Sequence, residues 1–167
     1  LSNYFTIYYV FSLPDKDLFF IVFIPVSEQQ PDFPSITSHI PAAHWYEREI
    51  KDMFGLEPVG HPDPHTLVLH GNMPANAYPL RKDFATNTRL PHIESKLPFA
   101  RVDGEGVFEI PVGPIHAGII EPGHFRFSAV GDTILYLDAK LFFTHKGTEK
   151  LFEAMPYTKA LFLAERI

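Results

Sequence analysis

The chain has 167 residues, of which 46% are hydrophobic and 20% charged, and its net charge at pH 7 is −6. This length and composition are typical of one ordinary domain or two small ones with a packed core. The negative net charge gives no support for nucleic-acid binding, which usually needs a basic surface. The absence of cysteine excludes disulfides, thiolate metal sites and a cysteine nucleophile, and it fits a cytosolic protein. No apolar run reaches the ~20 residues of a membrane-spanning helix.

Two segments rich in aromatic and β-branched side chains open the chain. Residues 4–11 and 18–26 have the composition of strands, and residues 13–17 supply turn chemistry between them, so a β-hairpin is expected. The polar, proline-containing residues 29–38 are expected to form a loop.

A helix is predicted next. Pro41 suits a first helical position, and Gly55 suits a left-handed cap at the end. Apolar side chains recur at helical spacing and predict one buried stripe: Tyr46, Ile50, Met53 and Phe54. Packing of this stripe on the hairpin would give a small mixed sheet with one helix.

The rest of the chain predicts a second module after a proline-containing linker. Residues 57–80 carry five prolines, and residues 87–106 are irregular. Strands are predicted at 107–112, 124–130 and 134–137, with a tight turn at 130–133, followed by helical pieces at 147–155 and 157–167. The fold class is therefore α+β, with modules at 1–86 and 107–167 joined by a linker at 87–106.

Three polar groups are candidates for chemistry. The histidines around His61-Pro62-Asp63-Pro64-His65 are expected to lie in a capped turn rather than at zinc, because the prolines forbid a helix. Arg81, Lys82 and Asp83 fit either a solvated turn or cations aimed at a carboxylate of a partner subunit. His116, Glu121 and His124 fit either proton handling at a hairpin tip or a plain exposed tip.

Two blocks of motifs resemble known redox proteins. Residues 47–49, 52–56, 60–63 and 79–84 resemble the C subunit of bacterial NADH:quinone oxidoreductase, complex I. Residues 113–116, 121–127 and 145–150 are similar to the start of its D subunit. They look closer still to the large subunit of energy-converting nickel–iron hydrogenases of the formate hydrogenlyase type, in which both parts are fused in this order.

The resemblance implies roles for individual residues. His116, Glu121, His124 and Arg126 match the hairpin near the redox site, with Glu121 at the position of a proton-path carboxylate. A second set is expected at interfaces with neighbouring subunits: Glu47, Arg48, Arg81, Lys82 and Asp83. At residues 64–66 the chain departs from the paired arginines that are usual in the C subunit, which weakens one such contact.

The resemblance also implies partners and cofactors for a full complex. These are an iron–sulfur small subunit, further subunits, a nickel–iron centre, iron–sulfur clusters and a quinone, on the cytoplasmic face of the inner membrane. The complex would couple electron transfer to proton handling. Both termini look cut, the C-terminal one before the first nickel-binding cysteine motif, so we expect this stretch to bind no metal or cofactor and to be catalytically silent. Alternatives are a quinone-reducing complex I relative and a non-catalytic scaffold that docks an iron–sulfur partner.

Overall fold

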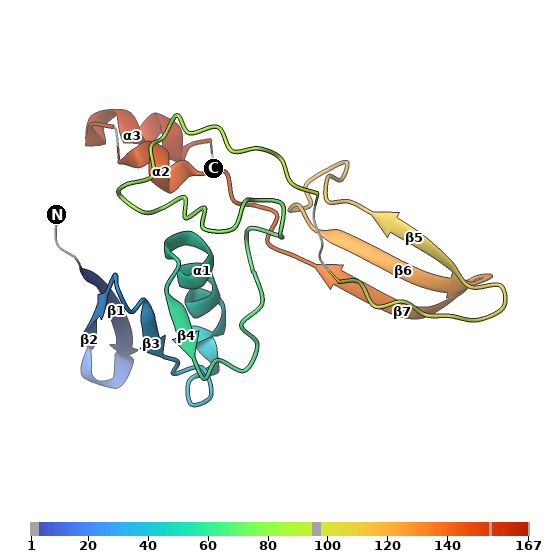
Figure 1. Cartoon of the computed structure of the whole chain (residues 1–167), viewed down its shortest axis with the longest axis horizontal. Coiled ribbons are helices and arrows are strands. Elements are labelled where there is room, and N and C mark those ends of the chain that lie inside the picture. The colour runs from blue at the N-terminus through green and yellow to red at the C-terminus, as the bar shows by residue number, and fades with distance from the viewer. Residues whose placement is uncertain (1–3, 95–97, 154, 167) are drawn as a thin grey trace. The chain divides into compact units, whose positions relative to one another are not determined.

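The computed structural model describes residues 4–94, 98–153 and 155–166, and the chain divides into two compact units (Figure 1). Unit one consists of Leu1–Lys51 and Gly55–Pro64, and unit two of Asp52–Phe54 and His65–Ile167. The linker predicted at 87–106 therefore lies within unit two. The mixture of small sheets and few helices agrees with the predicted α+β class.

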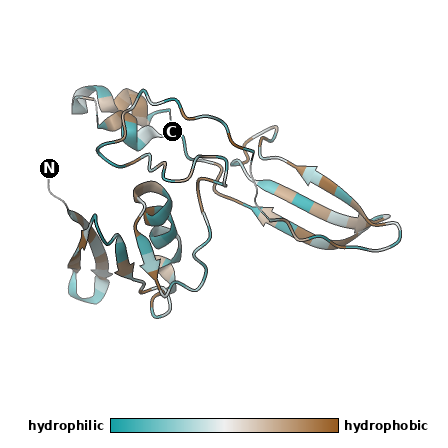
Figure 2. Ribbon diagram, viewed as in Figure 1, coloured by the Kyte–Doolittle hydropathy of each residue, from teal (hydrophilic) through white to brown (hydrophobic). Residues whose placement is uncertain are grey.

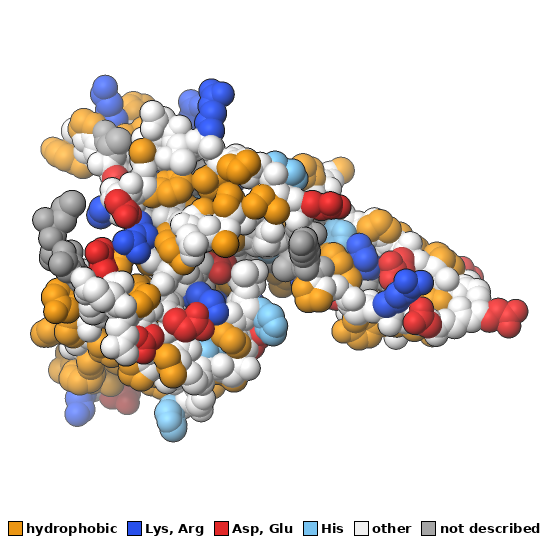
Figure 3. Space-filling model, in the orientation of Figure 1, with side chains coloured by type: hydrophobic (Ala, Val, Ile, Leu, Met, Phe, Trp, Pro, Cys, Tyr) orange, Lys and Arg blue, Asp and Glu red, His pale blue; other side chains and the backbone are white. Residues whose placement is uncertain are grey.

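The predicted hairpin of unit one is confirmed. Strand β1 (Tyr4–Leu13) pairs antiparallel with β2 (Leu18–Ser27), and a 3₁₀ turn at Pro14–Lys16 connects them. Ile7 and Val26 are buried on one face, whereas large apolar side chains remain exposed on the other. Figure 2 shows the hydrophobic character of these strands, and Figure 3 shows hydrophobic side chains at the surface of this region.

A second strand pair in unit one was missed. Strands β3 (Asp32–Pro34) and β4 (Glu57–Val59) pair in parallel, so the loop predicted at 29–38 is wrong for three of its residues. The predicted single mixed sheet is instead two separate two-stranded sheets. Each of these short strands lacks an alternating pattern, and its partner is distant in the sequence, so no local signal marks it.

Helix α1 (His44–Phe54) confirms the predicted helix. It follows a 3₁₀ turn at Pro41–Ala43, and Gly55, in the left-handed conformation at φ 73°, caps its end. The predicted apolar stripe is only partly correct. Met53 is fully buried, but Tyr46 is 69% exposed and the adjacent Glu47 occupies the interior instead.

An irregular segment opens the larger part of unit two. From His65 to Val107, the described residues form no helix or strand. The carboxylate of Asp52 holds the start of this segment by accepting hydrogen bonds from the backbone N–H groups of residues 67–69, at 2.8, 2.8 and 3.2 Å. Further along, the ring of His70 stacks on Phe143 at a centroid distance of 3.6 Å, and its Nε2 donates to the carbonyl oxygen of Phe142.

An antiparallel sheet carries the second block of motifs. Its strands are β5 (Phe108–Val112), β6 (His124–Val130) and β7 (Thr133–Lys140), in that order, with an irregularity between Ser128 and Ala129. The predicted helical pieces are present but shorter, as α2 (Thr148–Phe152) and α3 (Tyr157–Ala164). Among the residues that the structure describes, no helix is both long and apolar enough to cross a membrane.

Candidate functional site

The loop between β5 and β6 closes into a narrow neck at its base. Nε2 of His116 donates to the carbonyl oxygen of Gly123 at 2.7 Å, and Nδ1 of His124 donates to the carbonyl oxygen of Gly113 at 3.2 Å. The backbone N–H of Gly123 donates to the carbonyl oxygen of Pro114. Since a carbonyl can only accept, these contacts assign the donor nitrogen of each ring. In the neutral forms, Nδ1 of His116 and Nε2 of His124 are therefore the acceptors.

The neck requires glycine at its first position. Gly113 has a φ of +83°, a conformation that other residues rarely adopt. A Cβ at this position would collide with the carbonyl oxygen of Gly123 and would lie 2.7 Å from Nε2 of His116. The Gly-Pro-Ile-His motif thus begins with glycine because two chain segments and one imidazole meet there.

Phe99 joins two of the predicted site residues. Its ring contacts the His124 ring edge-on at 5.3 Å, and the Arg126 guanidinium lies over it at 3.9 Å from the centroid. Nε2 of His124 is buried, and no described residue forms a hydrogen bond with it. Phe99 comes from the segment predicted as a linker, where the sequence contains no signal for a site residue.

Glu121 lies apart from this arrangement. Its side chain is exposed, and among the described residues none pairs with its carboxylate by a hydrogen bond or ion pair. The loop tip beside it is apolar, with Ile115, Ile119 and Ile120 largely exposed. The structure therefore brings His124 and Arg126 together through Phe99 and ties His116 to the same neck, while Glu121 faces solvent.

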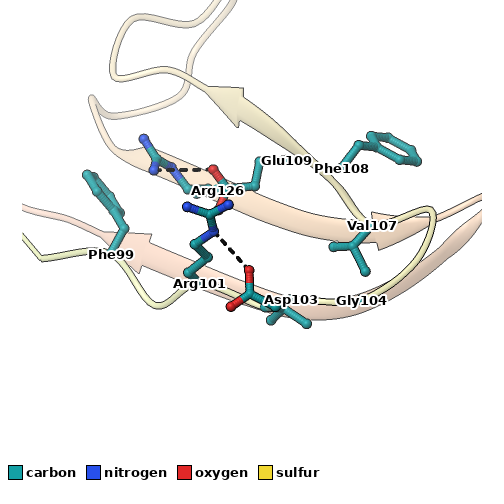
Figure 4. Close-up of a pocket in the computed structure, with 9 residues that line it drawn as sticks. Phe99, Arg101, Asp103, Gly104, Val107, Phe108, Glu109 and Arg126 are labelled. Atoms are coloured by element: carbon teal, nitrogen blue, oxygen red, sulfur yellow. Dashed lines mark hydrogen bonds and ion pairs between the residues drawn. The ribbon is translucent and has the colours of Figure 1, made fainter.

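A polar hollow lies against the sheet next to Arg126 (Figure 4). It has a volume of about 640 Å³ and is lined mainly by the segment before β5 and by strands β5 and β6. Nη1 of Arg126 donates to a carboxylate oxygen of Glu109 at 3.5 Å, which is at the outer limit of a hydrogen bond. At the mouth, Arg101 pairs with Asp103 at 3.0 Å, and both side chains are largely exposed.

Glu47, one of the residues expected at a subunit interface, lies in the interior of unit one. Its side chain is 0% exposed, and its carboxylate accepts a bond from the backbone N–H of Ile36 at 2.8 Å. Three hydroxyl groups also donate to it, from Tyr9, Ser35 and Thr37, at 3.4, 2.5 and 2.7 Å. Burial and the neighbouring Glu47 raise the pKa of Tyr9 to about 12. The carboxylate thus organises the chain around residues 35–37.

The cationic interface candidates are engaged within their own units. In unit one, Arg48 pairs with Asp63 at 3.2 Å. In unit two, Arg81 pairs with Asp83 at 3.2 Å and Lys82 pairs with Glu153 at 2.6 Å.

A cluster around Glu153 joins the two blocks of motifs inside unit two. The buried Lys150 donates to the carbonyl oxygen of Arg81 at 2.7 Å and to Glu153 at 2.9 Å. Hydrogen bonds from Lys82 and Lys150 hold the pKa of Glu153 below its usual value. Lys150 and Glu153 did not stand out in the sequence as site residues, although the Glu-Lys motif at 149–150 was part of the resemblance.

The residues present do not fit a resident nickel–iron centre or iron–sulfur cluster. Both depend on thiolate ligands, and the sequence has no cysteine. Among the described residues there is also no group of three or more histidine, aspartate or glutamate side chains that could hold a metal ion.

Comparison with known proteins agrees with the resemblance found in the two blocks. Residues 2–90 match the family model of the 30 kDa subunit of respiratory-chain NADH dehydrogenase. Over its whole length the chain is 42% identical to hydrogenase-4 component G and 38% identical to formate hydrogenlyase subunit 5, both of Escherichia coli (strain K12). It is 30% identical, over 83% of its length, to the C/D subunit of NADH-quinone oxidoreductase from Bacteroides thetaiotaomicron. The chain spans 31%, 30% and 29% of the lengths of these three relatives.

Proposed function

Because this chain belongs to the family of the 30 kDa subunit of respiratory-chain NADH dehydrogenase, we propose that it forms part of the large subunit of a hydrogenase complex of the formate hydrogenlyase type. One observation carries the proposal. The two hydrogenase relatives align with all of this chain, including the loop neck and helix α2 with Lys150 and Glu153 after it, which lie outside the family model.

The proposal gives this chain two tasks in such a complex. Unit one and the Arg81–Asp83 turn would dock against other subunits, among them an iron–sulfur small subunit. The β5–β6 loop would extend toward the redox centre, with Glu121 on the proton path and His116, His124 and Arg126 shaping the loop. The carboxylate of Glu121 is exposed and has no partner among the residues that the structure describes, which supports this task, because a proton-relaying group must reach groups outside its own unit.

The metal chemistry would come from other parts of the complex. A nickel–iron centre and iron–sulfur clusters would supply the redox steps there, since no residue of this chain provides a thiolate. We further propose that the complex is attached to the cytoplasmic face of the inner membrane and couples electron transfer to proton handling. A quinone would be the electron acceptor only in a complex I-type relative.

A chimera would test the proposal. This chain would replace the aligned segment of formate hydrogenlyase subunit 5 in an E. coli strain that lacks the native subunit. We expect the chimera to co-purify with the other subunits and to restore hydrogen evolution from formate. A well-expressed chimera that fails to assemble would contradict the proposal.

The same replacement in the C/D subunit of NADH-quinone oxidoreductase from B. thetaiotaomicron tests the quinone-reducing alternative. We expect weaker assembly there, because the identity with this chain is lower and covers less of it. Quinone reduction by this second chimera, together with failure of the first, would favour the alternative. Assembly of the first chimera without hydrogen evolution would favour the scaffold role.

A further inference from the structure

The hollow is lined by the guanidinium of Arg126, most of whose N–H donors meet no acceptor among the described residues. We propose that this hollow binds a carboxylate side chain from an acidic polypeptide segment of a partner subunit. The inference rests on the proposed function, because that function is what supplies a partner subunit.

The packing of Arg126 on an aromatic ring fixes the orientation of its guanidinium group. Its guanidinium lies 3.9 Å from the centroid of the Phe99 ring, and its side chain is 27% exposed. Stacking on an aromatic face orients the guanidinium plane, while the donors along its edge stay available. The segment that carries Phe99 is itself tied to the sheet, because the backbone N–H of Ala100 donates to Asp138 at 3.0 Å.

The acceptors around Arg126 do not match its donors. A guanidinium has five N–H donors, and a good carboxylate partner takes two of them in a bidentate pair at about 2.7–2.9 Å. The contact with Glu109 involves one nitrogen at 3.5 Å. Nε is buried, and no described residue accepts its hydrogen. An incoming carboxylate would therefore pair with the terminal Nη groups, whose contact with Glu109 is long.

Arg101 adds a second cation at the mouth. Its side chain is 81% exposed and pairs with Asp103, which is 83% exposed. An ion pair this exposed contributes little free energy, so Arg101 can turn to an incoming anion at small cost. The two arginines would then contact one carboxylate from two sides (Figure 4).

The lining favours a side chain over a free multivalent anion. Asp103 and Glu109 also line the hollow, and each of them pairs with one of the two arginines. Phe99, Val107 and Phe108 offer apolar surface to the methylene stem of a glutamate. A volume of about 640 Å³ also exceeds what a small ion fills.

The test uses the whole 167-residue chain, labelled with ¹⁵N, and the acetylated, amidated hexaglutamate peptide as the probe. Titration is followed by NMR on the arginine Nε–Hε signals. We expect the signals of Arg126 and Arg101 to shift in a saturable way, whereas hexaglutamine leaves them unchanged. Inorganic phosphate forms a second arm. Shifts with phosphate and none with hexaglutamate would overturn the assignment to an acidic segment.

Variants make the test specific. Arg126→Gln should weaken hexaglutamate binding by about tenfold or more, as expected for loss of a bidentate charge-assisted pair. Arg89→Gln, at an exposed arginine outside the hollow, is the matched control and should bind like the wild type. Glu109→Gln removes the competing carboxylate and should tighten binding several-fold. Unchanged or weaker binding by a folded Glu109→Gln protein would contradict the proposal.

The chimera experiment separates failure of this inference from failure of the proposed function. Assembly of the chimera without hexaglutamate binding by the chain would overturn the acidic-segment site alone. Hexaglutamate binding without assembly would leave the site in place and overturn the proposed function.

Discussion

The ammonium nitrogen of Lys150 lies 2.7 Å from the carbonyl oxygen of Arg81, a residue 69 positions earlier in the chain. Lys150 is only 8% exposed, and its second acceptor is the carboxylate of Glu153. Lys82 reaches the same carboxylate from the solvent side. Two sequence motifs that resemble different subunits of one enzyme are thus joined inside one compact unit.

We predict that Lys150→Met destabilises unit two by about 1–3 kcal/mol, because the carbonyl oxygen of Arg81 loses its charged donor and keeps only the backbone N–H of Phe84 at 3.1 Å. Lys82→Met is the matched control. Its side chain is 80% exposed and contacts the same Glu153, so its loss should cost less than about 1 kcal/mol. Urea unfolding of both variants measures the difference. Equal decreases in the free energy of unfolding would show that the buried contact of Lys150 stabilises unit two no more than the exposed contact of Lys82.

The Tyr9–Glu47 pair predicts a loss of stability at alkaline pH. The pKa of Tyr9 is about 12 in the folded chain, against 10.0 for the unperturbed group. Between these values the unfolded state loses the phenol proton and the folded state keeps it, so the free energy of unfolding falls as the pH rises from 10 to 12. Tyr9→Phe should remove this part of the pH dependence, whereas Tyr46→Phe, at an exposed tyrosine, should not.

Glu47→Gln should act on the same pair. Because Glu47 is the second cause of the shift after burial, its neutralisation should lower the pKa of Tyr9 without restoring the unperturbed value. Phenolate absorbance as a function of pH reports this change. The substitution should also destabilise unit one by about 1–3 kcal/mol, because donors that now meet a carboxylate would face an amide NH₂.

His70 predicts a loss of stability at acidic pH. Burial lowers its pKa from 6.5, so below that pH the unfolded state takes up a proton before the folded state does. The free energy of unfolding should therefore decline as the pH falls below 6.5. His70→Phe retains a ring against Phe143 and should remove this decline, whereas His92→Phe, at an exposed histidine, should retain it. Identical pH profiles of wild type and His70→Phe would contradict the prediction.

Gly113→Ala should open the neck of the β5–β6 loop. The new methyl group would meet the Gly123 carbonyl and the His116 ring, in addition to about 1 kcal/mol of backbone strain. Gly118→Ala, at φ +93° with nothing within 4 Å, carries the strain alone and is the control. NMR signals of the His116 and His124 rings should move in the first variant and stay in place in the second.

Glu121→Gln tests the proton path in the formate hydrogenlyase chimera. We expect hydrogen evolution to fall by about 10²-fold or more, in the range of general acid–base contributions, with assembly unchanged. Because the Glu121 side chain is exposed, its substitution should not disturb folding, and such a loss would come from the missing carboxylate. Wild-type turnover by a fully assembled variant would show that Glu121 carries no proton.

Much of the fold follows from local patterns in the sequence. The β1–β2 hairpin, helix α1 with its Gly55 cap, and strands β5 to β7 each carry their own alternation, period or turn residue within about ten positions. Strands β3 and β4 have no such signal, since each is three residues long and stabilised by a distant partner.

The sequence alone determined the element types except for β3 and β4, the absence of thiolate ligands and the two blocks that identify the family. Only the tertiary structure decided which polar side chains are internal. Glu47 reads as a surface residue in a charged helix, yet it is buried because distant hydroxyl and N–H groups converge on it. In the same way, the Phe99 ring packs against the guanidinium of Arg126, a residue distant from it in the sequence. A contact partner far along the chain leaves no mark on local periodicity, so these roles emerge only when the segments are packed together.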